Sequence, residues 1–170
     1  DDEQAKIKFK HTLIHEMFHC MTRSNPDFRA AMYRVINFEV DEKEYEFPDE
    51  ISSCILQNPD VDHMNSRAAF TVNGKKTECV MICMCPPYEK DGEGLTDLLI
   101  GFVPVDDLST LYSLNDISDF WDVVGKNTDY ILDPEEIMAK NFADALVYGT
   151  DGRSYPNPEI IQGVLDYLRK

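Results

Sequence analysis

The chain has 170 residues, of which 43% are hydrophobic and 28% are charged, and this composition is ordinary for a protein with a buried core. Sixteen basic residues against thirty-two acidic residues give a net charge of −16, which argues against nucleic acid and anionic membrane surfaces as partners. The length predicts a single domain over residues 1–170, and no apolar run approaches the roughly eighteen residues of a membrane span.

The cysteines favour a reducing compartment. Five are present, and an odd number cannot pair completely within one chain. Cys79, Cys83 and Cys85 share one face of a predicted strand, at a spacing that differs from a zinc clip of paired cysteines. No secretory signal opens the chain, so we expect reduced thiols and a cytoplasmic location. The chain begins with Asp1 rather than Met, as a trimmed or processed part of a longer protein would.

The first third of the chain predicts two helices followed by a loop. Apolar residues recur at helical spacing over residues 5–22, and Ser24-Asn25-Pro26 ends that pattern and caps a second helix. The acidic segment 41–50 predicts a loop with a short strand near residues 45–47, and residues 51–56 predict a short helix.

The middle of the chain predicts a small antiparallel sheet. Residues 68–72 and 76–85 flank Asn73-Gly74, a dipeptide typical of tight hairpin turns. A polar loop is expected over residues 86–94, and a third strand is expected over residues 95–105.

The last third predicts three more helices. A short helix is expected over residues 116–124, and Asp133 is placed to cap a longer helix that runs to about residue 148. Asn157-Pro158 opens the last helix. A small antiparallel sheet that has helices before it and after it in the chain predicts an α+β fold.

One motif carries chemistry. His15, Glu16 and His19 form an HExxH pattern inside the first predicted helix. Residues four apart lie above one another on a helix, so both histidines can direct a ring nitrogen at one zinc ion. Glu16 lies one step around from His15, where it can act as the general base toward a zinc-bound water. The apolar residues within and beside the motif indicate a helix that is partly buried.

The third zinc ligand comes from a later helix by resemblance to a family. The chain resembles gluzincin-type zincin metallopeptidases, and more loosely the compact minigluzincins, in which a glutamate on a later helix completes a His-His-Glu site. In several such families that helix reads Glu-x-x-Ala-Asp-x-Phe-Ala, and matching positions here hold Glu136, Ala139, Phe142 and Ala143. The resemblance implies a zincin-like fold in which Glu136 is the third ligand.

Glu135 is the alternative to Glu136 as the ligand. It shares a helix face with Met138 and Phe142, and that face can be the one turned inward. Glu136 would then only complement the helix dipole in the first turn. The sequence leaves both assignments open.

Two departures from the family pattern stand out. The family places an aspartate that supports a ligand histidine where this chain has Lys140, and three other residues could take that role: Asn141, Asp144 or Asp133. Zincins also usually place the substrate-aligning edge strand before the HExxH helix, whereas all strands predicted here follow it. Either the segment between the two ligand helices supplies the sheet, or an upstream portion is missing.

Other candidate residues are less specific. His11 lies one helical turn before His15 and is expected to donate a hydrogen bond at the helix edge, and His63 is expected to be exposed. An oxyanion-stabilising group would lie opposite Glu16, and three tyrosines flank the ligand helix: Tyr130, Tyr148 and Tyr155.

The resemblance implies a zinc-dependent peptidase, a hydrolase that acts on a peptide or protein substrate. Zinc would be held by His15, His19 and Glu136, with Glu16 as the general base. The net negative charge favours basic or neutral substrates on encounter. The alternatives are a catalytically attenuated zincin-like binding or regulatory domain, with Lys140 as the sign of decay, and an interaction domain in which the HExxH pattern is coincidental.

Overall fold

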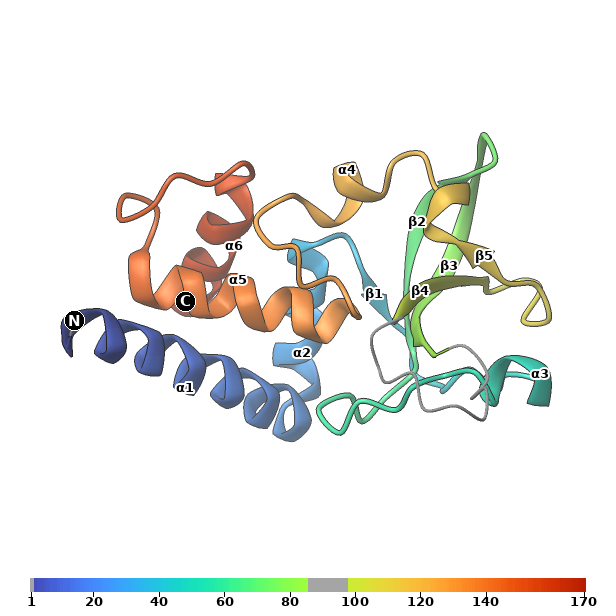
Figure 1. Ribbon diagram of the computed structural model, residues 1–170, viewed down its shortest axis with the longest axis horizontal. Helices are drawn as coiled ribbons and strands as arrows, with labels where there is room; N and C mark the ends of the chain where they lie inside the picture. Colours follow the sequence, from blue (N-terminus) through green and yellow to red (C-terminus); the bar gives the residue numbers. More distant parts are fainter. Residues whose placement is uncertain (1, 86–97) are drawn as a thin grey trace.

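The computed structural model describes residues 2–85 and 98–170. Its four longest helices gather on one side of the molecule and its sheet on the other, with the short helix α3 (Asp49–Ser52) on the side of the sheet (Figure 1). The helical side holds α1 (Asp2–Ser24), α2 (Pro26–Val35), α5 (Pro134–Tyr148) and α6 (Pro158–Leu168). Helices α1 and α5 run antiparallel, because His19 contacts Glu135 near one end and His11 contacts Asp144 near the other.

The sheet has five antiparallel strands in the order β1-β2-β3-β4-β5. They are β1 (Glu39–Val40), β2 (Ser66–Val72), β3 (Lys75–Met84), β4 (Leu99–Pro104) and β5 (Tyr112–Ser113). The predicted β2–β3 hairpin is confirmed, since Asn73 and Gly74 both have positive φ angles, 48° and 82°, as its tight turn requires. The α+β class is therefore confirmed.

Aromatic side chains fill the core. Phe18, Phe28 and Phe142 join α1, α2 and α5, with ring centroids 5.2 to 5.8 Å apart. On the sheet side, Phe70 and Phe102 contact Phe120 of α4 (Phe120–Val124). The contacts of Phe18, Phe28 and Phe142 pack α5 against α1, and this pair of helices carries the candidate site.

Capping residues determine where α2 and α5 begin. Asn25 accepts a hydrogen bond from the backbone of Phe28 at the start of α2, and Asp133 accepts one from the backbone of Glu136 at the start of α5. The prediction of Asp133 as a cap is confirmed. Because Asp133 fixes the first turn of α5, it also fixes where Glu135 and Glu136 lie.

Three sequence predictions were wrong, at residues 45–47, 51–56 and 116–124. No strand forms at residues 45–47, where Tyr45 and Phe47 instead pack against a smaller core cluster, and β1 lies earlier in the chain. The helix expected over residues 51–56 is limited to α3 (Asp49–Ser52), because Ile55 then pairs with Met84 as a bridge.

The helix expected over residues 116–124 begins later than predicted. A short 3-10 turn, η2 (Leu114–Asp116), comes first, and Ile117 and Ser118 then bond to β2 before α4 begins at Phe120. Pairing with a neighbouring strand thus overrides the local helical pattern. The predicted loop at 86–94, and the first residues of the strand expected at 95–105, lie outside the described residues.

The five cysteines are all free, as expected. Burial raises the pKa of the Cys79 thiol to about 12 and that of Cys83 to about 11, so both stay protonated. Within residues 2–85 and 98–170, no helix combines the length and the apolar character that crossing a membrane requires.

Candidate metal centre

The packing of α1 on α5 brings His15, His19 and Glu136 together. The Nε2 atoms of His15 and His19 lie 3.1 Å apart, and Oε2 of Glu136 lies 3.1 Å from the first and 3.9 Å from the second. Ligand atoms around a tetrahedral zinc lie roughly 3.3 Å from one another, given bonds of about 2.0–2.1 Å. The donor types and their separations therefore fit a zinc ion.

Glu136 carries a buried oxygen without a partner. Its Oε1 accepts a hydrogen bond from Nδ2 of Asn58 at 2.9 Å, but among the described residues its Oε2 receives none of proper geometry. Burial would raise the pKa of Glu136, yet contacts with His15 and Asn58 outweigh burial and lower it. An ionised, buried and unsatisfied carboxylate oxygen is costly unless a cation faces it. This oxygen faces the two ring nitrogens, where a metal would lie.

Glu135 lies on the other side of His19. Its Oε1 accepts a hydrogen bond from Nδ1 of His19 at 3.0 Å and another from the hydroxyl of Thr22 at 2.5 Å. Its Oε2 accepts one from the hydroxyl of Tyr33 at 2.7 Å. Because Nδ1 carries the proton, Nε2 of His19 presents its lone pair to His15 and Glu136.

The two glutamates lie against different atoms of the histidines. Oε2 of Glu136 lies beside the two Nε2 atoms, whereas Oε1 of Glu135 contacts Nδ1 of His19. The residue that supports His19 is therefore none of the three expected in place of the family aspartate. Asp133 caps α5, Asn141 bonds to the backbone of Ile137, and Asp144 contacts His11 and Arg153. That prediction was wrong because the supporting carboxylate precedes Glu136 in the chain instead of following it.

The charges around His19 suit a cation. Burial lowers the pKa of His19, but the hydrogen bond to Glu135 and the charges of Glu135 and Glu136 outweigh it and raise the pKa. The same two carboxylates that favour a proton on this ring also favour a metal ion beside it.

Glu16 occupies the open side of the site. It is exposed, and among the described residues it forms no hydrogen bond or ion pair. One ligand atom each of Glu16, His19 and Asp60 lies within 4.8 Å of the others. Glu16 therefore lies at the mouth of the site, as the motif predicts, and Asp60 of the loop after α3 lies beside it.

The loop after α3 contributes Asn58, which the sequence analysis missed. Besides Glu136, its Nδ2 approaches Oδ2 of Asp133 at 3.3 Å. Burial raises the pKa of Asp133 to about 6 against the opposing effect of its hydrogen bonds. The only sequence signal here was Asn58-Pro59, which reads as a helix stop and carries no information on which carboxylate the amide contacts.

Of the three candidate tyrosines, Tyr130 lies nearest to the site. Its ring centroid is 6.5 Å from that of His15, and the residue is 42% exposed. Burial raises its pKa, so its hydroxyl remains a donor. Tyr148 lies beside His11 instead, and the hydroxyl of Tyr155 donates to the backbone of Asp144 at 3.4 Å.

The other two histidines lie outside the ligand cluster. Nε2 of His11 bonds to Oδ1 of Asp144 at 2.9 Å, which confirms the expected role at the helix edge. His63 is exposed, as predicted, and its Nδ1 lies 2.7 Å from Glu44.

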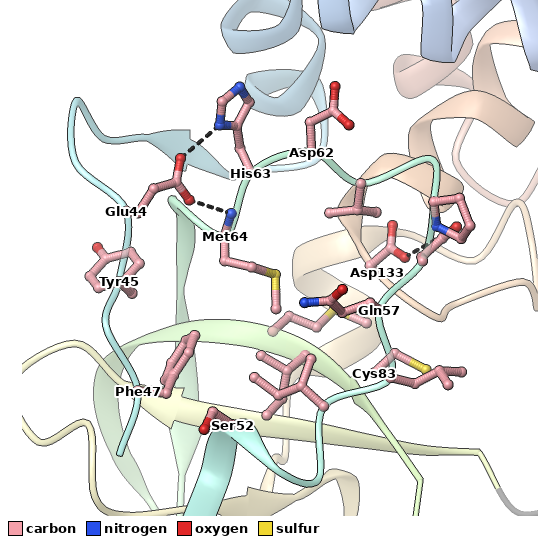
Figure 2. A pocket seen from close by; sticks show the side chains of 17 residues that line it. Glu44, Tyr45, Phe47, Ser52, Gln57, Asp62, His63, Met64, Cys83 and Asp133 are labelled. Atoms are coloured by element: carbon pink, nitrogen blue, oxygen red, sulfur yellow. Dashed lines mark hydrogen bonds and ion pairs between the residues drawn. The ribbon is translucent and has the colours of Figure 1, made fainter. Parts of the chain in front are cut away.

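A cavity of about 860 Å³ adjoins the site (Figure 2). It lies between the loop segments at 44–64 and strand β3, and Asn58 and Asp133 belong both to its wall and to the surroundings of Glu136. Most of its lining is apolar, including Phe47, Met64 and Ile82, whereas Glu44 and Asp62 add negative charge. A cavity with this lining suits an apolar side chain.

Comparisons with protein-family models, with curated proteins and with solved structures find no match for this chain.

Proposed function

We propose that this protein is a zinc-dependent peptidase, in which His15, His19 and Glu136 hold the metal. The observation that carries the proposal is the convergence of two Nε2 atoms and one unpartnered carboxylate oxygen on a common point. A bound zinc would supply a Lewis acid that polarises a carbonyl and lowers the pKa of water.

The protein's own residues would divide the remaining work. Glu16 would take a proton from the attacking water and pass it to the leaving amine, since it is exposed and forms no hydrogen bond or ion pair with the described residues. Tyr130 lies where its hydroxyl could donate to the negative charge that develops on the carbonyl oxygen. Glu135 would keep His19 in one tautomer, and Asn58 would hold Glu136 in place.

On this proposal Lys140 is no sign of an attenuated domain. Glu135, through its contact with His19, would take the supporting role that the family gives to the aspartate which Lys140 replaces.

The test is a cleavage screen against a broad peptide library with mass-spectrometric detection. We expect zinc-dependent products from the protein and none from Glu16→Gln, since general acid–base catalysis contributes about 10² to 10⁴ in rate. Glu3→Gln, which changes an exposed glutamate at the start of the same helix, is the matched control and should cleave normally. Products that persist in Glu16→Gln, or a zinc-loaded protein that cleaves nothing, would contradict the proposal.

A further inference from the structure

We propose that a basic hollow beside the candidate metal centre binds a carboxylate of the peptide substrate, so that the enzyme selects acidic peptides or free peptide C-termini. This inference rests on the proposed peptidase function. The hollow has a volume of about 690 Å³. Its basic lining residues are Lys126, Lys140 and Arg153, and His11 also lines it.

The local charge is the reverse of the overall charge. The chain has twice as many acidic as basic residues, yet the hollow has three permanent cations and only two carboxylates, Asp129 and Asp144. Asp144 is already engaged, because His11 and Arg153 both contact it. Lys126 and Lys140 form no ion pair among the described residues, so their ammonium groups are available to an anionic ligand.

The basic character continues beyond the hollow. An adjoining depression of about 490 Å³ shares four lining residues with it, namely His11, Lys140, Asp144 and Arg153, and adds Lys8. Lys140 therefore lines two concave surfaces, and both of them carry further basic side chains. The 860 Å³ cavity differs, since it has no lysine or arginine in its lining and its carboxylate residues are Glu44, Asp62 and Asp133.

The position of the hollow suits a substrate that lies along the α1–α5 seam, the line along which these two helices contact each other. His11 lies one helical turn from His15, and Lys140 lies one turn from Glu136, which is about 6 Å along each helix axis. An extended peptide advances about 3.3 Å per residue. A carboxylate in the hollow would therefore belong to a residue two or three positions from the bond that is cut.

The lining can hold such a group. Trp121 is 38% exposed at the wall and offers an apolar face to the stem of an acidic side chain. Lys126 is held at its backbone, where its N–H donates to Oδ1 of Asn157 at 2.8 Å. Ammonium–carboxylate contacts at a partly exposed site raise affinity by roughly fivefold.

The binding test uses labelled heptapeptides of alanine and phenylalanine and the Glu16→Gln protein, with fluorescence anisotropy in roughly 50 mM salt. One series carries a single glutamate moved along a C-terminally amidated peptide. A neutral peptide is compared as free acid and as amide, so that a side-chain carboxylate and a C-terminal carboxylate are distinguished. We expect one of these acidic probes to bind about fivefold more tightly than the neutral amide, and the advantage to shrink with added salt.

Variants assign the effect to the hollow. The acidic advantage should disappear in Lys140→Gln and in Lys126→Gln and should persist in Lys10→Gln, which changes an exposed lysine outside the hollow. Lys140→Glu should favour a lysine-bearing probe instead. Equal binding of acidic and neutral probes, no binding of any probe, or an advantage that survives in the Lys126→Gln/Lys140→Gln double variant would overturn the inference.

The binding readout separates this inference from the peptidase proposal. If peptides are cleaved with dependence on Glu16 but without preference for a carboxylate, the hollow inference is overturned and the peptidase stands. If nothing is cleaved but acidic probes still bind through Lys140, the peptidase proposal is overturned and the carboxylate site stands.

Discussion

The two ends of the α1–α5 seam use the same kinds of side chain with different results. At one end His11 meets Asp144, and both carboxylate oxygens of Asp144 have partners in His11 and Arg153. At the other end His15 and His19 meet Glu136, whose Oε2 is buried and has no hydrogen-bond partner among the described residues. In the first arrangement both carboxylate oxygens have partners, whereas the second leaves a buried acceptor that a cation would satisfy.

The comparison shows that a histidine–carboxylate contact does not by itself indicate a metal site. What distinguishes the end proposed to bind metal is a set of potential ligand atoms that lie close together and whose side chains are held by other residues. Glu135 holds Nδ1 of His19, and Asn58 holds Oε1 of Glu136, so the remaining atoms are turned toward each other. At the other end, His11 and Arg153 together satisfy both oxygens of Asp144, and among the described residues no third ligand atom joins them.

The largest expected difference between the two ends is in activity. His15→Ala should abolish cleavage in the peptide screen, a loss of at least about 10³-fold, because the metal loses a ligand. His11→Ala removes a histidine one turn away on the same helix and should change the rate on neutral peptides by less than about threefold. Equal losses in both variants would show that the two ends do not differ as described.

Removal of the metal should come next in size. A chelator should lower the melting temperature measured by calorimetry, since a ligand present at about 1,000 times its Kd stabilises the folded state by about 4 kcal/mol. For a domain of this length that corresponds to a shift of roughly 10 °C. The shift should vanish in His15→Ala and persist in His11→Ala. If the chelator leaves the melting temperature of the unmodified protein unchanged, that result would count against a bound metal.

Glu135→Gln should weaken metal binding without eliminating it. Loss of the charged acceptor at Nδ1 of His19 should lower zinc affinity by about 10- to 100-fold, as measured by competition with a chromogenic chelator. Tyr33→Phe is the matched control, because it removes one hydrogen bond to the same carboxylate and leaves the charge in place. A larger effect of Tyr33→Phe than of Glu135→Gln would contradict the role given to Glu135.

The smallest effect is expected at the complete end of the seam. Asp144→Asn should lower the free energy of unfolding by about 1–2 kcal/mol in urea titrations, because the buried contacts with His11 and Arg153 weaken. Zinc content should stay unchanged. A loss of zinc in this variant would place Asp144 in the metal site after all.

The helices and the hairpin could be predicted from the sequence because their signals are local. Asn25 and Asp133 cap helices, and Asn73-Gly74 sets a turn, within a few residues of where they occur. The segments at 45–47 and 116–118 could not be predicted, since contacts with distant strands and side chains decide their conformation.

The residues of the candidate site also divide into those that the sequence predicts and those that it does not. His15, Glu16 and His19 follow from spacing on one helix, and Glu136 followed from a family pattern. The supports of the site come from elsewhere in the chain, and Asn58 lies 78 residues from Glu136. The choice between Glu135 and Glu136 also needed the structure, because adjacent helix positions differ only in the direction in which they face the partner helix.

The most direct test of the central claim is the zinc content of the protein purified without added metal, measured by mass spectrometry for four proteins. The unmodified protein and Asp144→Asn should each contain about one zinc per chain, whereas Glu136→Gln and His15→Ala should contain almost none. Absence of zinc from the unmodified protein even after reconstitution, or full occupancy in Glu136→Gln, would contradict the account of the two ends of the seam.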